Sequence, residues 1–253
     1  MTAAPDGVVA QRAVIVLPST GAFDSRTWRI AGSLARRGHD VTVLARRGPG
    51  VADAETAPDG YRIVRVATDA VDGLPTPLRQ IARRLRPARR PAASGATGVE
   101  PEARATTSAG RGGVLGRARR AGASLWRLVA IGLTVRSQQL ATRRVAPSAD
   151  LVHAMAYMGI PVGLDLGRRA GAQVVYDARD IYAEARNIAR MPAPFRALFA
   201  RIERRWAHAA DRVITVNEPY ADEMARRFGV ARPLVVLNCS PLRDLPAFRP
   251  LSS

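Results

Sequence analysis

Short runs of apolar residues recur along the chain and alternate with longer segments in which apolar residues return every three or four positions. A continuous apolar run of four to seven residues is typical of a strand that is buried on both faces of a parallel sheet. The first two such runs are AVIVL and VTVLA. The runs predict strands at residues 13–17, 41–45, 61–67, 151–154, 173–176, 212–216 and 234–237.

The segments between these runs show the periodicity of helices. Trp28, Ala31 and Leu34 fall on one helical face, and Gly38 stands where a C-terminal glycine belongs. Strands that alternate with helices favour an α/β fold built on a doubly wound, Rossmann-like parallel sheet. Helices are predicted at residues 27–37, 114–145 and 161–170, at about 195–206 with Phe195, Leu198, Phe199, Ile202 and Trp206 on one face, and from the start signal at Asn217 to Gly229.

The pattern fails at residues 87–113, an insert rich in Arg, Pro and Ala with almost no large apolar residues. Such a segment cannot bury enough surface to offset its ordering entropy, so the insert is predicted to be disordered. We expect one domain over residues 12–245 that contains this insert. A disordered N-terminus at 1–11 precedes it, and a tail at 246–253 follows it.

The formal charge of +18 makes nucleic acid the first partner class to consider. However, every basic residue is arginine and alanine is abundant, which indicates a compositional bias of the whole chain. Helix-turn-helix signals and aromatic base-stacking platforms are missing, so nucleic-acid binding is the weaker alternative. An anionic membrane surface suits a basic patch equally well. Residues 125–144, which combine Arg with Leu and Trp, either dock on such a surface or pack their Leu and Trp on the core.

Compartment and cofactor are also constrained by composition. Cys239 is the only cysteine, which fits a reducing cytoplasm. The longest apolar stretch, at 125–135, is interrupted by Arg127 and is too short to span a bilayer. We expect a cytoplasmic protein, soluble or associated with the cytoplasmic face of a membrane. The three histidines and one cysteine have no zinc-ligand spacing, so no metal or other cofactor is expected.

Ligands of open parallel sheets bind at the carboxyl ends of the strands, which selects four places. The first is the loop PSTGAFDSR, where Gly21 permits close backbone approach and the following helix start attracts anions. The alternative is an ordinary loop in which Asp24 or Ser25 caps the helix. Arg26 opposes the helix dipole, so a ligand or carboxylate partner is predicted for it.

The second and third places follow the strands at 151–154 and 173–176. His153 and Tyr157 form the second, with a satisfied core histidine as the alternative. At the third, acids surround an arginine and can bind polyhydroxyl groups or shift each other's pKa, unless Asp177 or Asp180 merely caps a helix. The groups of this third place are Asp177, Arg179, Asp180, Tyr182 and Glu184.

The fourth place is VVLNCSP, at the end of the last predicted strand. Asn238 is its candidate binding residue, with a side-chain-capped turn as the alternative. Cys239 has no neighbouring His or Lys in the sequence that would make it a nucleophile, so it is expected to be a small core residue.

Three blocks in this order resemble glycosyltransferase family 4. FDSRTWRIAGSLARRGHDVTVLARR is similar to the family's loop with Asp and Arg, its helix, and its Val-x-Val strand. DLVHAMAYMGIPVGLDLGRRAGAQVVYDARDIYAEAR resembles the strand ending in His, the helix, and the strand ending in Tyr-Asp-Ala-His-Glu. ADRVITVNEPYADEMARRFGV with LVVLNCSP resembles the last strand–helix–strand. Arg179-Asp180 replaces the family's His-Glu, so no role of that His is carried over.

The resemblance implies one half of a GT-B fold, the N-terminal, acceptor-side domain of a hexosyl-type glycosyltransferase. Such an enzyme transfers sugar from a nucleotide-sugar donor to an acceptor hydroxyl with retention, here to a lipid-linked or cell-envelope acceptor. The donor domain is expected to be missing from this chain, which leaves the isolated half inactive or dependent on a separate donor-domain chain. A non-catalytic domain that binds an acceptor or a partner is the alternative. The implied acceptor-side residues are Gly21, Asp24, Arg26, His153, Tyr157, Asp177, Arg179, Asp180, Glu184 and Asn238.

Overall fold

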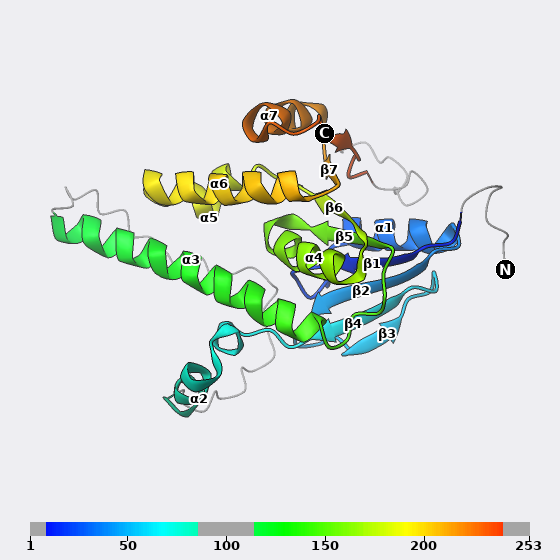
Figure 1. The fold of residues 1–253 in the computed structure, drawn as a ribbon, viewed down its shortest axis with the longest axis horizontal. Helices are drawn as coiled ribbons and strands as arrows, with labels where there is room; N and C mark the ends of the chain where they lie inside the picture. The colour runs from blue at the N-terminus through cyan, green and yellow to red at the C-terminus, as the bar shows by residue number, and fades with distance from the viewer. Residues whose placement is uncertain (1–8, 86–113, 240–253) are drawn as a thin grey trace, which may run out of the picture.

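The computed structural model describes residues 9–85 and 114–239, and its centre is an eight-stranded sheet (Figure 1). All neighbouring strands are parallel except β3, which runs antiparallel to β4 at one edge. The order is β3-β4-β2-β1-β5-β6-β7-β8, so the chain moves outward in both directions from β1. This confirms the predicted α/β class. The strands are β1 (Arg12–Val16), β2 (Asp40–Arg46), β3 (Ala54–Thr56), β4 (Arg62–Val66), β5 (Leu151–Met155), β6 (Gln173–Asp177), β7 (Arg212–Thr215) and β8 (Leu234–Val235).

Helices cover both faces of the sheet, because alternate residues of each buried strand point to opposite sides. Ala13 and Ile15 of β1 join a cluster that packs under α1 (Ser25–Arg36). Val14 and Val16 join the larger cluster, which is covered by α3 (Val114–Thr142), α4 (Ala156–Ala170), α6 (Ala193–Ala209) and α7 (Glu218–Phe228). Gly38, with φ +87°, follows α1 and donates its N–H to Ala35, which confirms the predicted helix end.

Small residues let α4 lie close to the sheet. A Cβ added to Gly163 would come within 2.5 Å of the Ala154 side chain. The helix begins at Ala156, so the predicted start at Pro161 is wrong. The residues between them are helical because they include Ile160, which is buried in the core. Pro161 lies inside the helix and lacks only the N–H that would bond to the carbonyl of Tyr157.

Helix α3 has 29 residues and its N-terminal half extends away from the sheet (Figure 1). Val135 is buried against the core, but Leu125, Trp126 and Val129 are exposed. Leu128 and Ile131 of the same helix do pack against the core. The alternative in which residues 125–144 pack on the core is therefore right for Leu128 and wrong for Leu125 and Trp126. Leu198 is likewise exposed. Of the predicted apolar face of α6, only Phe199 is fully buried.

Several short elements were not predicted. They are β3, α2 (Thr76–Leu85), α5 (Arg186–Ala189) and the 3-10 turns Ala70–Gly73 and Tyr182–Glu184. Most have only three or four residues, whereas α2 does carry Leu78, Ile81 and Leu85 at helical spacing, and the prediction missed it. The predictions of disorder at 87–113 and 1–8, and of a tail at 246–253, fall outside the described residues; residues 9–11 form neither helix nor strand. Within the described ranges, no helix combines the length and apolarity needed to cross a membrane.

Candidate functional site at the carboxyl edge of the sheet

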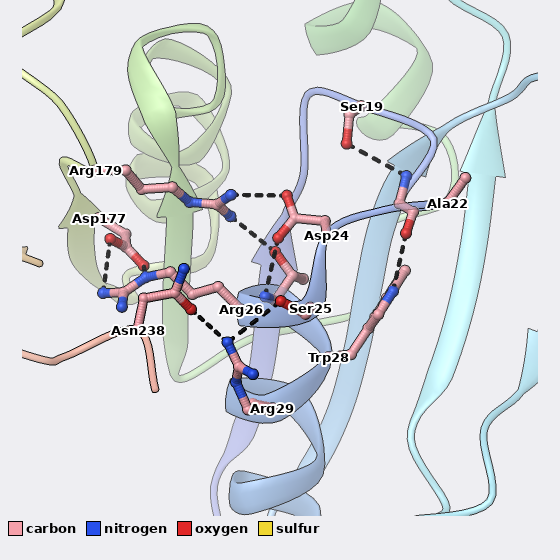
Figure 2. Close-up of polar contacts among 12 residues, drawn as sticks. Ser19, Ala22, Asp24, Ser25, Arg26, Trp28, Arg29, Asp177, Arg179 and Asn238 are labelled. Atoms are coloured by element: carbon pink, nitrogen blue, oxygen red, sulfur yellow. Dashed lines mark hydrogen bonds and ion pairs between the residues drawn. The ribbon is translucent and has the colours of Figure 1, made fainter. Parts of the chain in front are cut away.

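The loop after β1 is built around Gly21, which has a φ of +83°. A side chain there would collide with Trp28, whose ring lies 2.2 Å from the position of an added Cβ. Trp28 also donates its indole N–H to the Gly21 carbonyl over 2.9 Å. Asp24 then caps α1 by accepting from the Thr27 amide at 3.1 Å, as the alternative of an ordinary loop capped by Asp24 or Ser25 supposed (Figure 2). The glycine thus serves the packing of α1 directly.

Arg26 forms a buried, two-pronged ion pair with Asp177, and this confirms the carboxylate partner that its position predicts. Its Nε and Nη2 donate to the two carboxylate oxygens over 2.8 Å and 3.1 Å. The side chains are 4% and 0% exposed. The remaining Nη1 donates to the carbonyl of Val236, just beyond β8, over 2.7 Å. One guanidinium therefore ties together the ends of three separate chain segments.

His153 stands on β5 with its Nε2 3.3 Å from Oδ2 of Asp177. The histidine is buried and satisfied, as the core alternative supposed, but its partner is the carboxylate that also holds Arg26. Burial opposes ionisation of Asp177, yet the hydrogen bonds from His153 and Arg26 outweigh it and hold the pKa of this carboxyl below its usual value. Asp177 is thus an anion inside the protein, and it does not cap a helix.

Arg179 lies next to this pair (Figure 2), and its side chain is partly exposed. It donates to Asp24 over 2.8 Å and to the Thr27 hydroxyl over 3.0 Å, while its buried Nε has no partner. Asp24 lies in the loop after β1 and Arg26 in the first turn of α1, whereas Asp177 ends β6 and Arg179 lies in the loop that follows it. They form two neighbouring ion pairs, Arg26–Asp177 and Arg179–Asp24, at the carboxyl edge.

Two residues complete the edge. Arg29, one helical turn beyond Arg26, donates to the side-chain oxygen of Asn238. Arg29 was not among the predicted residues, although its i+3 spacing from Arg26 was a usable signal. Asn238 therefore joins the same corner, by a contact to α1 that crosses 209 positions of the chain.

The other predicted residues lie apart from this set. Tyr157 packs against the rings of Tyr182 and Phe199, at centroid distances of 4.9 Å and 5.4 Å. Asp180 accepts from the neighbouring Ile181 amide, and Glu184 is an exposed partner of Arg227. The structure therefore separates them from the Asp177 cluster.

Cys239 is exposed, so the expectation of a core residue is wrong. The reason is that β8 ends at Val235, four residues earlier, and the chain has by then left the sheet.

Comparison with known proteins places this arrangement in a family. The sequence matches the glycosyl transferase 4-like domain over residues 21–239, which is most of the chain. The chain belongs to the glycosyl transferase 4-like domain family. All ten predicted acceptor-side residues lie within the matched range, as do both ends of the charged cluster. No curated protein matches the chain.

Solved structures show more distant similarity to this glycosyl transferase 4-like domain. Sucrose-phosphate synthase from Thermosynechococcus elongatus aligns with 15% identity and a TM-score of 0.49 over 89% of this chain and 47% of its own. A second structure of that synthase aligns with 14% identity and a TM-score of 0.45, over 91% of this chain and 90% of its own. An NADH-dependent reductase complexed with NAD aligns with 12% identity and a TM-score of 0.32, over 82% of this chain and 78% of its own. The chain spans about half the length of the first synthase.

Proposed function

We propose that this domain forms the acceptor side of a glycosyltransferase that moves a hexosyl group from a nucleotide-sugar to an acceptor hydroxyl with retention of configuration. Membership of the glycosyl transferase 4-like family supports the transferase class. The observation that carries the site is the buried Arg26–Asp177 pair, which holds charged groups at the sheet edge where ligands of parallel sheets bind. Removing two charges from water costs free energy that their attraction only partly restores, so stability alone does not explain a pair this deeply buried. We propose that the pair serves the binding site instead.

Burial divides the cluster into two roles. Arg26, Asp177 and His153 are almost completely covered, so they hold the edge in place. Arg179 and Asp24 keep 26% and 12% of their side chains exposed, so they are the groups that sugar hydroxyls can reach. Asp24 accepts hydrogen bonds, and Arg179 supplies donors and positive charge.

In the proposed reaction, the acceptor oxygen bonds to the anomeric carbon as that carbon's bond to the diphosphate oxygen breaks. The acceptor hydroxyl loses its proton, and the nucleoside diphosphate leaves with the bonding electron pair. Charge therefore develops on the leaving group, where fixed cations stabilise the transition state. The domain described here orients the acceptor by Asp24 and Arg179.

The test is transfer by the protein as its native cells make it, assayed against a panel of labelled nucleotide-sugars. Product NMR reports the anomeric configuration. Arg179→Gln is expected to lower kcat/KM about 10- to 100-fold, because a hydrogen bond to a charged group is lost. Arg168→Gln, on the exposed far end of α4, is the matched control and should leave it unchanged. Acceptor binding without any transfer would favour the non-catalytic binding domain instead.

We also propose an anionic membrane surface as a partner, because α3 exposes Leu125, Trp126 and Val129 on its projecting part. Exposed apolar groups beside arginine are typical of helices that lie in the membrane interface. Flotation with vesicles that contain anionic lipid tests this. Binding that does not depend on anionic lipid, or that survives Leu125→Ala with Trp126→Ala, would contradict it.

A further inference from the structure

A second hollow lies at the same edge of the sheet, on the side covered by α3, α4 and α5. Arg46 ends β2, and Tyr157 directly follows the start of α4 after β5, so both walls stand at the carboxyl ends of strands. The pocket measures about 470 Å³, within the range of small-molecule sites. Of the predicted site residues, it contains Tyr157 alone.

Among the residues that the structure describes, three arginines line this pocket and no carboxylate does. They come from three separate elements: Arg46 from β2, Arg127 from α3 and Arg190 from the end of α5. Arg46 donates to the hydroxyl of Thr68 over 2.7 Å. None of the three pairs with an acidic side chain of the described residues. Elsewhere in this part of the chain, arginines such as Arg143 and Arg227 do find carboxylates.

The rest of the wall is mainly apolar. Ile131 of α3, Met158 of α4 and Met191 after α5 face the same space. Met191 is buried, while Arg127 and Arg190 are exposed, so the pocket is apolar within and cationic at its mouth. A ligand that fits must carry an anion on one part and hydrocarbon on another.

We propose that this pocket binds a phosphorylated amphiphile, a phosphate monoester with an apolar portion, which is the acceptor substrate. Three guanidinium groups carry three positive charges, of which a carboxylate balances one, whereas a phosphate monoester offers three terminal oxygens and nearly two negative charges. The methionines follow the shape of a flexible hydrocarbon. The identification as acceptor rests on the proposed transferase function, because the pocket and the Asp24–Arg179 pair share one edge of the sheet.

Binding is measured directly by calorimetry on the 253-residue chain, with n-octyl phosphate below its micelle-forming concentration as the probe. Inorganic phosphate and the uncharged octyl glucoside are the comparison ligands. Each is expected to bind at least tenfold more weakly than octyl phosphate, since each lacks one of the two recognised parts. The double variant Arg127→Gln with Arg190→Gln should weaken octyl phosphate at least tenfold.

Matched controls separate the pocket from general charge. Arg168→Gln with Arg201→Gln removes two exposed helical arginines elsewhere and should leave binding unchanged. Ala130→Trp fills the pocket and should abolish binding, with thermal denaturation showing that the variant is folded; if it is not, the arginine variants decide alone. Equal loss in both double variants, equal binding of inorganic phosphate, or binding only above the micelle-forming concentration would overturn the proposal. Transfer to an acceptor without phosphate, with no probe binding, would refute this pocket's role while leaving the transferase function intact.

Discussion

Two arginine–aspartate pairs lie at opposite ends of the sheet, one where the parallel strands begin and one where they end. They differ mainly in burial. At the amino edge, Arg12 at the start of β1 holds Asp150 before β5 through Nε, Nη2 and the backbone amide. At the carboxyl edge, Arg26 holds Asp177 with the same two-pronged geometry. The first pair is 51% and 39% exposed, and the second is 4% and 0% exposed.

The difference shows that the free-energy cost of removing charges from water arises at the carboxyl ends of the strands and not at the amino ends. Hydrogen bonds from Arg12 lower the pKa of Asp150 to about 2, with little burial to oppose them. Burial raises the pKa of Asp177, so the hydrogen bonds from His153 and Arg26 must outweigh that effect to hold the pKa below its usual value. A tether between neighbouring strands can be built in water, as Asp150 shows, so tethering alone does not explain the buried pair. We infer that the carboxyl edge needs fixed charges that solvent does not screen.

The largest effect is expected for Asp177→Asn, which leaves Arg26 buried without its counter-ion. Breaking a buried pair from one side typically costs about 3–5 kcal/mol of unfolding free energy. The folded-state pKa of Asp177 is depressed, so its contribution is present above the usual carboxyl pKa and is lost as pH falls through the lower value. The difference between wild type and variant should therefore shrink in acid. Urea denaturation at pH 7 and pH 3 measures this.

A double variant tests whether the cost comes from the orphaned charge. Arg26→Met with Asp177→Leu removes both partners, and its destabilisation should be clearly smaller than the sum of the single changes. Additive losses would mean that the pair's packing, and not its charge, matters.

The sequence predicted the Arg26 partner and, as an alternative, the Asp24 cap, because both follow from local rules about helix starts. It did not predict that Arg26 would find Asp177, 151 positions away, since register and sheet order decide that contact. The same limit explains Arg29 with Asn238. Conversely, Asp180 and Glu184 lie close to Asp177 in the sequence, but Asp180 accepts from the Ile181 amide and Glu184, at the end of the turn Tyr182–Glu184, pairs with Arg227. Buried strands were predicted well because a short continuous apolar run suits a strand that is covered on both faces.

Glu203 sharpens the comparison, because it is a buried carboxyl that forms no ion pair with the described residues. Burial raises the pKa of Glu203 to about 7 from its usual 4.5, although the Tyr176 hydroxyl donates to it over 3.2 Å. The folded protein thus keeps a proton that the unfolded chain releases. This stabilisation is complete below about pH 4.5 and is lost as pH rises through about 7.

The expected span is about 3 kcal/mol between pH 4.5 and pH 8, at about 1.4 kcal/mol for each pH unit of the gap. Glu203→Gln cannot titrate, so its stability relative to wild type should rise over this window by that amount. Urea denaturation of both proteins at pH 4.5 and pH 8 measures this difference. Parallel pH profiles would show that Glu203 is ionised in the folded state, as Asp177 is.

Gly21→Ala should have a smaller effect, of about 1–3 kcal/mol, because an alanine at φ +83° is strained and its Cβ meets the Trp28 ring. The displaced Trp28 would shift the start of α1, which carries Arg26. Gly50→Ala is the matched control, since Gly50 has a φ of +74° but no atom within 4 Å of an added Cβ. In thermal denaturation, the Tm of Gly21→Ala should be clearly lower than the Tm of Gly50→Ala. Equal losses would show that backbone strain alone acts.

The smallest effect is expected for Asp150→Asn, and it decides whether the two edges differ as argued. The Arg12–Asp150 pair is solvated, so asparagine can keep one hydrogen bond while water replaces the other. Its destabilisation at pH 7 should be a small fraction of that of Asp177→Asn. Added salt should reduce it further, because exposed charges are screened whereas buried ones are not. Denaturant midpoints of both variants at low and high sodium chloride measure this contrast. A loss at Asp150 as large as that at Asp177, and equally insensitive to salt, would mean that burial does not separate the two pairs; the charges at the carboxyl edge would then need no functional role to account for them.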